Sequence, residues 1–529
     1  MAIMDMAMVR SAKSTSVFLI TTLFGSGVSA AESEFSLSTS LTETYSDNVL
    51  LSTFEQDDSY ITNATINLSS SVSSKALNMN LNSSYSHLFY SHDSELNKGY
   101  ESLSTSGQFA PWFSGPALSF SGTIANAPRS IAGNSQSDLI SGDTIKTTSY
   151  GVGLVQNVVN SDFNLGASIN YSDNSAEDDV GESNGYQAGV SFSNGSSHRV
   201  LFWDISGSYS DRKNRGQSAR SFQTEGKLGL QTAWKLNPFI RYFNEDYTGS
   251  ISNNQNDQGE SWGAGFRWQP KRNLLIDLSY NLVSDEELTD DYVDTNINWT
   301  PTSRTSIQAG YNQRFFGDSY SFNLTHRNKR LTNTISYNEQ IQAFQRDSFE
   351  TFIDSTIWCP LGQPIDVNNC LDSSDGVENI DEFAEVPLFG VRPVEDNQFS
   401  LYKTLSWNST LALARTTFNL ILSNSEREDL NTGNVQDFLS SNLSATRKMN
   451  SRSSVTLAWS FTRNNYTTVN GDLISEQRDY YRNYNLSYDR TIAESLSLDI
   501  SIRYLDRASN FNRRSYEETR ANIAIRKDF

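Results

Sequence analysis

Apolar and polar side chains alternate along this chain with a period of two, and the pattern returns about every twenty residues. In Asn273–Val283, one face collects the apolar residues Leu274, Ile276, Leu278, Tyr280 and Leu282. Asp277, Ser279 and Asn281 occupy the other face, and in Ser495–Leu505 Asp499 and Arg503 lie on the corresponding polar face. Such alternation is typical of strands with one apolar face, so the chain is predicted to be all-β.

Composition separates a membrane barrel from a soluble β-sandwich, which also alternates. Hydrophobic residues make up 37% of the 529 residues, too few for several packed cores, while 12% aromatic residues are too many for a disordered chain. A membrane barrel needs apolar side chains only on its outside, because its inner face meets water. We therefore predict a transmembrane antiparallel up-and-down β-barrel, with Asp277, Asn281, Asp499 and Arg503 facing the lumen.

The strand-like stretches and their connections fit this fold. The stretches are about ten residues long, enough to cross a bilayer at a tilt, and many end in an aromatic residue. Short connections such as Asn160–Asp162 and Lys271–Asn273 alternate with long ones such as Asp47–Asp58 and Ser130–Ile145. This rhythm is typical of periplasmic turns and extracellular loops in a Gram-negative outer membrane. The count of stretches predicts about 24 strands, with 22 to 26 as the range.

Residues 1–30 resemble a secretory signal peptide. Arg10 and Lys13 precede a short apolar core, and Val28-Ser29-Ala30 has the small residues of a cleavage site. The alternative, a membrane anchor, would need about twenty apolar residues. We expect residues 31–529 to be exported and to form the barrel. The net charge of −20, near −21 without residues 1–30, argues against a nucleic-acid partner.

The segment 346–396 is unusually long for a connection and contains both cysteines of the chain. In an exported protein, Cys359 and Cys370 are expected to form a local disulfide. The sequence leaves two interpretations of the segment open. It either bends into the lumen and narrows it, or it remains a surface loop with a small disulfide-bonded knuckle.

Motifs of catalysis and cofactor binding are not found in the sequence. The four histidines, His87, His92, His198 and His326, have no metal-ligand spacing, and no nucleophile elbow or phosphate loop is present. We therefore expect neither an enzyme nor a cofactor, although a Ser near His326 keeps an outer-membrane hydrolase as a third hypothesis. The terminal Phe529 resembles the C-terminal signal read by the barrel assembly machinery.

A short motif near the expected mature N-terminus carries a family resemblance. Phe35–Leu51 contains Thr42-Glu43-Thr44-Tyr45-Ser46-Asp47-Asn48-Val49, and it resembles outer-membrane proteins associated with the PEP-CTERM/exosortase system. It is also similar to β-barrel porins found beside exopolysaccharide genes, as are the turns Trp268–Arg272 and Trp299–Arg304. The resemblance implies an outer-membrane barrel in a locus for extracellular polysaccharide and surface-protein sorting. It brings no catalytic residues.

Two function hypotheses follow from these patterns. The first is a passive or gated outer-membrane pore, porin-like, with polysaccharide as the transported partner and the outer-membrane lipid and assembly machinery as further partners. The second is a structural or adhesive barrel with a closed lumen and loops that bind partners. The polar lining supports the first, although an acidic polysaccharide would require inward arginines such as Arg267 and Arg503 to outweigh nearby aspartates.

Overall fold

The described part of the chain excludes the expected signal peptide. The computed structural model describes residues 32–53, 56–112, 115–129, 138–249, 258–284, 291–344, 348–361, 370–371, 382–394, 399–430, 433–470, 473–510 and 514–529. The prediction for residues 1–30 therefore lies outside the described residues. No helix in these ranges is both long and apolar enough to cross a membrane.

Twenty-four strands form one closed antiparallel sheet, in which neighbours along the chain pair and β1 pairs with β26. This confirms the predicted β-barrel and its number of strands. The first twelve are β1 Glu32–Ser46, β2 Ser59–Ser73, β3 Leu77–Tyr90, β4 Lys98–Phe109, β5 Ala117–Pro128, β6 Thr144–Val159, β7 Phe163–Ala176, β8 Ser183–Asn194, β9 Leu201–Asn214, β10 Gln217–Leu230, β11 Leu236–Gly249 and β12 Gln258–Lys271. The others are β13 Leu274–Val283, β14 Tyr292–Thr302, β15 Thr305–Arg314, β16 Gly317–Arg327, β17 Leu331–Gln342, β20 Ser400–Ala412, β21 Thr416–Asp429, β22 Val435–Lys448, β23 Ser453–Asn470, β24 Leu473–Ala493, β25 Leu496–Ser509 and β26 Tyr516–Asp528.

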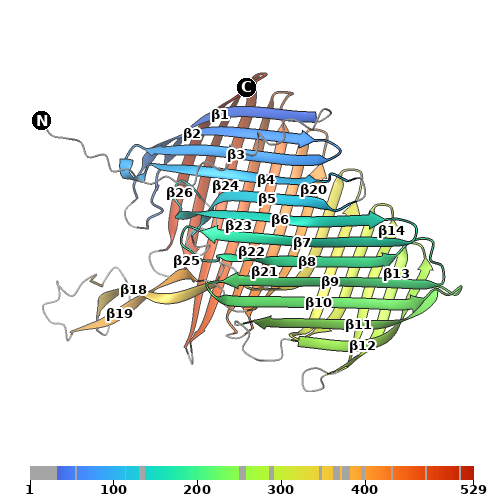
Figure 1. The fold of residues 1–529 in the computed structure, drawn as a ribbon. Coiled ribbons are helices and arrows are strands. Elements are labelled where there is room, and N and C mark those ends of the chain that lie inside the picture. The colour runs from blue at the N-terminus through green and yellow to red at the C-terminus, as the bar shows by residue number, and fades with distance from the viewer. Residues whose placement is uncertain are drawn as a thin grey trace, which may run out of the picture.

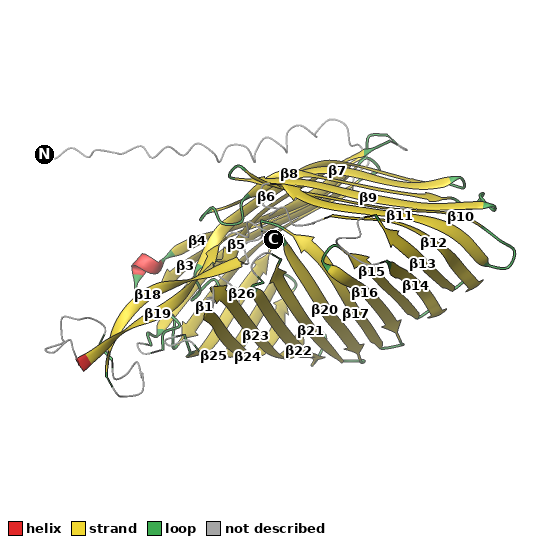
Figure 2. Cartoon of the chain, turned by 90° about the horizontal axis from the view of Figure 1, so that it is seen from below, coloured by secondary structure: helices red, strands yellow, loops and turns green. Residues whose placement is uncertain are grey.

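The strands of the two walls run in different directions. Figure 1 shows β1–β12 side by side on one wall, while β13–β17 and β20–β26 cross behind them at a steep angle. Figure 2, turned by 90°, shows β6–β11 lying above the wall that contains β12–β17 and β20–β26. Strands of a closed sheet must tilt against the barrel axis, so strands on opposite walls cross.

The alternation seen in the sequence separates an outer face from an inner face. In β13, Leu278 and Tyr280 are 51% and 55% exposed, whereas Asp277 and Asn281 are 2% and 0% exposed. A water-soluble fold would bury the apolar set. The reverse arrangement is stable where hydrocarbon surrounds the barrel and every backbone polar group is paired within the closed sheet. The chain is therefore an outer-membrane protein.

Aromatic rings gather on the outer face toward one end of the barrel. Ring pairs from neighbouring strands lie about 5 Å apart (centroid to centroid); they are Tyr45–Tyr60 at 5.1 Å, Tyr171–Tyr186 at 5.1 Å, Tyr242–Trp262 at 4.5 Å and Tyr311–Tyr320 at 5.3 Å. Amphipathic rings of this kind form the girdle at a membrane–water interface.

Connections differ at the two ends of the barrel. At one end, which we call the short-connection end, strands are joined by segments such as 160–162, 272–273 and 303–304. The other, the long-connection end, carries 47–58, 129–143 and 343–399. The pattern of long connections also predicts one over Asp173–Asn184, but β7 and β8 extend into this range and leave only 177–182 between them. The barrel strands are 10 to 21 residues long, so most of them exceed the expected length of about ten.

The long segment between β17 and β20 contains a second, two-stranded sheet. Its strands β18 (Ser348–Pro360) and β19 (Phe383–Val394) pair only with each other. Figures 1 and 2 both show this hairpin projecting beyond the barrel. A disulfide joins Cys359 at the end of β18 to Cys370, where Trp358 and Leu371 also form a β-bridge.

Side chains of the motif at the end of β1 reinforce the closing pair β1–β26. Asn48 Nδ2 donates to Glu517 O (2.9 Å), and Asp47 Oδ1 accepts from Thr519 N (2.7 Å). Ser46 Oγ donates to Glu518 Oε1 at 2.5 Å. Asn48 also holds the turn that follows β1, since its Oδ1 accepts from the Ser52 N–H at 2.9 Å. The motif therefore joins the two strands that close the barrel, besides opening a turn as its Asp-Asn pair predicts.

Candidate functional site: the inner wall of the barrel

Strands β2, β3 and β4 line the lumen with uncharged polar groups. Strand alternation places every second side chain of each strand on the inner face. We call this surface the hydroxyl–amide wall, and it consists of Asn63, Thr65, Asn67, Asn82, Ser84, Ser86, Ser102, Ser104 and Ser106. Its hydroxyls pair across strands, as Thr65 Oγ1 and Ser86 Oγ do at 2.8 Å.

In contrast to the uncharged wall of β2–β4, the inner face of β10–β14 carries charged side chains that contact one another. We call this set the ionic network, and it contains three cations and three carboxylates: Lys227, Arg241, Arg267, Glu225, Asp277 and Asp294. Arg267 binds Asp277 with two hydrogen bonds of 2.8 Å. Lys227 Nζ lies 3.4 Å from both Asp277 and Glu225. The charges of the network balance, which is the condition for a stable buried ionic cluster.

Arg241 links the greatest number of strands within the network. Its Nε donates to Glu225 Oε1 at 2.7 Å, its Nη1 donates to Tyr292 OH at 3.0 Å, and its Nη2 lies 3.4 Å from Asp294 Oδ2. The side chain is 1% exposed, and its guanidinium lies over the Phe243 ring at 5.1 Å. A single side chain of β11 thus connects β10 to β14 through charge-assisted hydrogen bonds.

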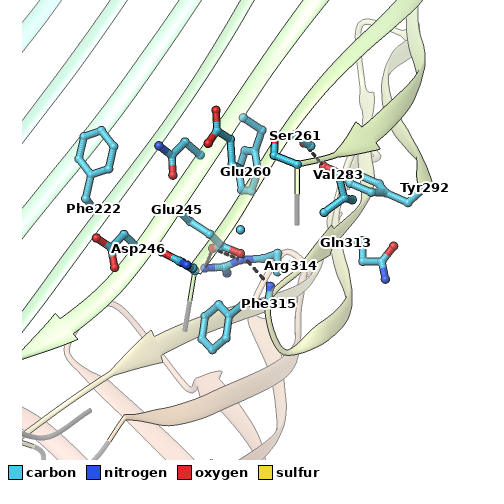
Figure 3. A pocket seen from close by; sticks show the side chains of 15 residues that line it. Phe222, Glu245, Asp246, Glu260, Ser261, Val283, Tyr292, Gln313, Arg314 and Phe315 are labelled. Carbon is cyan, nitrogen blue, oxygen red and sulfur yellow. Dashed lines mark hydrogen bonds and ion pairs between the residues drawn. The ribbon is translucent and has the colours of Figure 1, made fainter. Parts of the chain in front are cut away.

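Figure 3 shows a second contact between distant strands, at the long-connection end, where Arg314 and Phe315 converge on Glu245. Arg314 Nε and Nη2 donate to Glu245 Oε2 at 2.9 Å and 2.8 Å, and the Phe315 N–H donates to Oε1 at 3.0 Å. Glu245 is fully buried beside a pocket of about 390 Å³. This contact joins β11 to β15, so the wall from β10 to β15 bends sharply, and ion pairs and a small pocket occupy its corner.

The base of the long segment packs against the same corner. Phe344 and Phe399 are 2% and 6% exposed and belong to an apolar cluster with Ala219 and Tyr247 of β10 and β11. The Tyr247 and Phe399 rings are 5.5 Å apart. Of the two interpretations left open by the sequence, the hairpin β18–β19 follows the outward one, whereas the residues at its base fold inward.

A different connection, between β5 and β6, also folds inward. In its described part, 138–143, the carbonyls of Leu139 and Ile140 accept hydrogen bonds of 2.7 Å from Tyr100 OH and Tyr90 OH on the inner wall. Ile140 packs against the apolar cluster that includes Tyr90 and Tyr100. Residues 138–143 therefore cover the inner face of β3 and β4 at the long-connection end.

A buried ion pair, which we call the clamp, attaches this segment to β26. Arg520 Nη1 and Nη2 lie 3.1 Å and 2.7 Å from the two oxygens of Asp138, and both side chains are 5% exposed. Arg520 also binds Glu518 Oε1 at 2.7 Å. Burial by itself would raise the pKa of Asp138. The Arg520 guanidinium and hydrogen bonds from Arg520 and the Ile140 N–H outweigh it and hold that pKa below its ordinary value.

The residues predicted to face the lumen all lie on inner-face positions of their strands. Asp277 is part of the ionic network, and Asn281 accepts a hydrogen bond of 3.2 Å from Arg241. Arg503 Nε donates to Asn483 Oδ1 at 3.2 Å, and Asp499 lies opposite Asp489 on the neighbouring strand. The structure does not bring the four together: two lie on β13 and two on β25.

Other residues singled out in the sequence lie away from the inner wall. Phe529 is 72% exposed, and its N–H donates to Leu37 O of β1 at 2.9 Å. His326, at the short-connection end, contacts Thr305 Oγ1 at 2.9 Å. Across the described residues, no group of three or more His, Cys, Asp or Glu side chains is arranged to hold a metal ion.

Sequence reasoning missed Glu225, Lys227 and Arg241, the centre of the ionic network. In β11, Phe239 and Phe243 face inward beside Arg241, while Ile240 faces outward and is 54% exposed. Both faces of this strand are thus partly apolar, and period-two alternation cannot distinguish them. A usable signal was the clustering of three arginines or lysines with acidic residues on neighbouring predicted strands.

Comparison with known proteins identifies no family. No family model and no curated protein matches the chain. Among solved structures, the siderophore receptor PirA from Acinetobacter baumannii is 9% identical, with 93% of this chain and 80% of that chain covered and a TM-score of 0.42. OpdK from Pseudomonas aeruginosa, solved with vanillate, is 10% identical over 94% of this chain and 99% of that chain, with a TM-score of 0.36. Sequence identities and TM-scores this low say nothing about a ligand. The fold is defined by the strand pairing of the closed sheet.

Proposed function

We propose that this barrel is an outer-membrane channel for a hydrophilic sugar polymer, in an exopolysaccharide or PEP-CTERM surface-protein system. The observation that carries the proposal is the hydroxyl–amide wall, an uncharged polar surface on the inner face of a closed 24-stranded barrel. Hydroxyl and amide groups exchange hydrogen bonds with sugar hydroxyls and with water at similar strength. A polymer can therefore slide along them without being trapped, as conduction requires.

The position of the corner at β10–β15 supports the same function. The ionic network and the base of the long segment occupy the inner face of β10–β15. Among the described residues, the elements outside the 24-stranded sheet are the short 3-10 helix η1 (Ser94–Leu96) and the hairpin β18–β19. The described part of the chain thus supplies no separate domain to fill the barrel. The path of a solute would follow the hydroxyl–amide wall, away from the corner.

The terminal Phe529 fits a second element of the proposal, recognition by the barrel assembly machinery. Its exposed ring lies on the outer face, in line with Ile523 and Ile525, which are 53% and 49% exposed. An apolar strand end that remains accessible from the membrane is a surface that an assembly factor can bind before closure.

One observation favours a second candidate function, a non-conducting adhesive barrel. The hairpin β18–β19 projects from the long-connection end and is stabilised locally by the Cys359–Cys370 disulfide. A rigid projection of this kind suits the binding of a surface partner. The packing of Phe344 and Phe399 on Tyr247 narrows the adjacent mouth, as a closed lumen would also require.

Planar-bilayer recordings of the purified full-length chain separate the two. A channel gives stepwise ion currents that neutral oligosaccharides interrupt in a concentration-dependent manner. The folded state is checked by the difference in gel migration between unheated and heated samples. If a barrel folded by this criterion gives no ion current, the channel is overturned and the adhesive barrel is left. Recording a Cys359→Ser, Cys370→Ser variant tests the hairpin, because a channel should conduct unchanged without the disulfide.

A further inference from the structure

A groove of about 510 Å³ runs across the inner wall of β22–β26, apart from the hydroxyl–amide wall and the ionic network. Most of its inward-facing lining consists of amides and hydroxyls, with one guanidinium and no carboxylate. These polar lining side chains include Asn442, Asn483, Asn485, Ser501, Arg503 and Asn522.

Strand register places these groups on a diagonal across the inner wall, which moves by two residues at β24 and again at β25. Asn442 lies opposite Ser460, which lies opposite Asn483 on β24. Asn485 lies opposite Arg503, and Ser501 lies opposite Asn522 on β26. Neighbouring strands in a sheet are about 4.8 Å apart and residues along a strand about 3.3 Å apart. The diagonal from β22 to β26 therefore extends over roughly 19 Å across the strands and roughly 13 Å along them, the length of a few sugar residues.

Arg503 differs from the other inward arginines of β25 and β26 in that no described carboxylate lies within ion-pair distance of it, although the charges of Asp138 and Glu518 act on it from farther away. Arg507 pairs with Asp479 at 3.1 Å, and Arg520 pairs with Asp138 and Glu518 at 2.7 Å. Arg503 forms no ion pair with any described residue, and its one hydrogen bond goes from Nε to the uncharged Asn483 Oδ1 at 3.2 Å. Its two terminal nitrogens are thus left to bind a group in the groove.

The position opposite Arg520 adds a second reason for an anion here. Arg503 and Arg520 are directly paired across β25 and β26, where like charges oppose each other at short range. Asp138 and Glu518 offset part of this repulsion, but their hydrogen bonds go to Arg520 and none goes to Arg503. An incoming carboxylate at Arg503 relieves this repulsion, and the planar guanidinium can hold it with two parallel hydrogen bonds.

We propose that this groove is a binding subsite for an acidic sugar residue, a uronate, of the polymer that passes through the barrel. Arg503 binds the carboxylate, and the amides of Asn483, Asn485 and Asn522 bind the hydroxyls of the same and the adjacent sugar. The subsite deepens the proposed function and rests on it. It also gives the lumen selectivity, because amides accept any sugar whereas the guanidinium favours an acidic one.

Channel block by oligosaccharides tests the subsite. Full-length wild type, Arg503→Gln and the matched control Arg526→Gln are reconstituted in planar bilayers. Arg526 also lies on β26, but it pairs with Asp528 at the short-connection end. Blockers are a galacturonate hexamer and a neutral maltohexaose. For Arg503→Gln, we expect the half-blocking concentration of the galacturonate hexamer to rise about tenfold to a hundredfold, because the substitution removes charge-assisted hydrogen bonds to the carboxylate. That of maltohexaose should stay unchanged, as should both values in the control.

A second variant and a binding measurement make the outcomes distinct. Asn485→Ala should weaken both blockers, since it removes an amide and leaves the charge. Unchanged block of Arg503→Gln by the galacturonate hexamer, or an equal loss for both sugars, overturns the subsite while the channel stands. If the wild type does not conduct, the proposed function fails. Calorimetric titration of the detergent-solubilised barrel with the galacturonate hexamer then still decides whether Arg503 binds an acidic sugar.

Discussion

The ionic network on β10–β14 and the clamp between Arg520 and Asp138 are built from the same chemistry but join different things. Arg241 ties strand to strand, so every group that it binds is fixed by the closed sheet. Arg520 ties a strand to a connection, and Asp138 lies on a segment that side chains, and not backbone pairing, attach to the sheet. Equally buried ion pairs thus have unequal mechanical roles: the network sets the shape of the barrel, whereas the clamp sets the position of a detachable segment.

The largest effect is expected in the network. Arg241→Met keeps the length of the side chain but leaves the buried Asp294 and the partly exposed Glu225 without their main cation. Removing one partner of a buried ionic cluster costs about 3–5 kcal/mol of the free energy of unfolding. Denaturant unfolding of the barrel in lipid vesicles, followed by tryptophan fluorescence, measures it. A loss below about 1 kcal/mol would mean that the network does not shape the barrel.

The clamp is expected to change local dynamics more than global stability. Asp138→Asn removes the charge that Arg520 binds and keeps an oxygen for the Ile140 N–H. Amide hydrogens of residues 138–143 should then exchange about tenfold to a hundredfold faster, the equivalent of a lost charge-assisted bond. Hydrogen exchange with mass spectrometry measures this, and amides of β11 serve as the internal control. Equal acceleration in β11 would erase the distinction between the two clusters.

Acid should release the clamp only well below neutral pH. The pKa of Asp138 lies below its ordinary value in the folded protein, so the clamp is fully present above the unfolded value of about 3.9. It is lost as pH falls through the lower, folded value. Exchange of residues 138–143 should therefore be insensitive to pH between about 7 and 5, after correction for the intrinsic rate. Release near pH 6 would contradict the depressed pKa, and Asp138→Asn should show no such transition.

The smallest effect is expected for a water-exposed ion pair of the same type on the outer face, two residues beyond the Tyr484–Tyr504 ring pair toward the long-connection end. Arg482 Nη1 lies 2.8 Å from Asp506, but the arginine side chain is 49% exposed. Arg482→Met should change the free energy of unfolding by less than about 1 kcal/mol in the assay used for Arg241→Met. A loss equal to that of Arg241→Met would show that burial is not what distinguishes the network.

The barrel was predictable from the sequence because strand alternation is a local property. In β13 and β25, a shift of one residue would exchange the two faces, so the positions of Asp277 and Arg503 follow directly from the pattern. The contacts between these faces were not predictable in the same way. Arg241 reaches Asn312, 71 residues away, only because the wall bends sharply between their strands.

Connections were the least predictable part of the molecule. The inward course of 138–143 depends on carbonyls that accept from Tyr90 and Tyr100, and any sequence can supply backbone carbonyls. The segment 346–396 was treated as a loop because its prolines and acidic residues obscure the pairing of β18 with β19. Cys359 and Cys370, by contrast, were assigned to each other from the exported setting of the chain alone.

The pairing of β1 with β26 has a consequence for the order in which the molecule can be made. Almost every other strand finds its partner within a hairpin, so most of the sheet can grow from local contacts. Until the hydrogen bonds between Thr519 and Asp47 and between Phe529 and Leu37 form, however, β1 and β26 are unpaired edge strands. A strand of another chain could pair with either edge. The pairing of β1 with β26 is thus a late step that joins the two ends of the chain and closes the barrel. It involves Ser46, Asp47 and Asn48, and a sheet in which it fails is prone to aggregation.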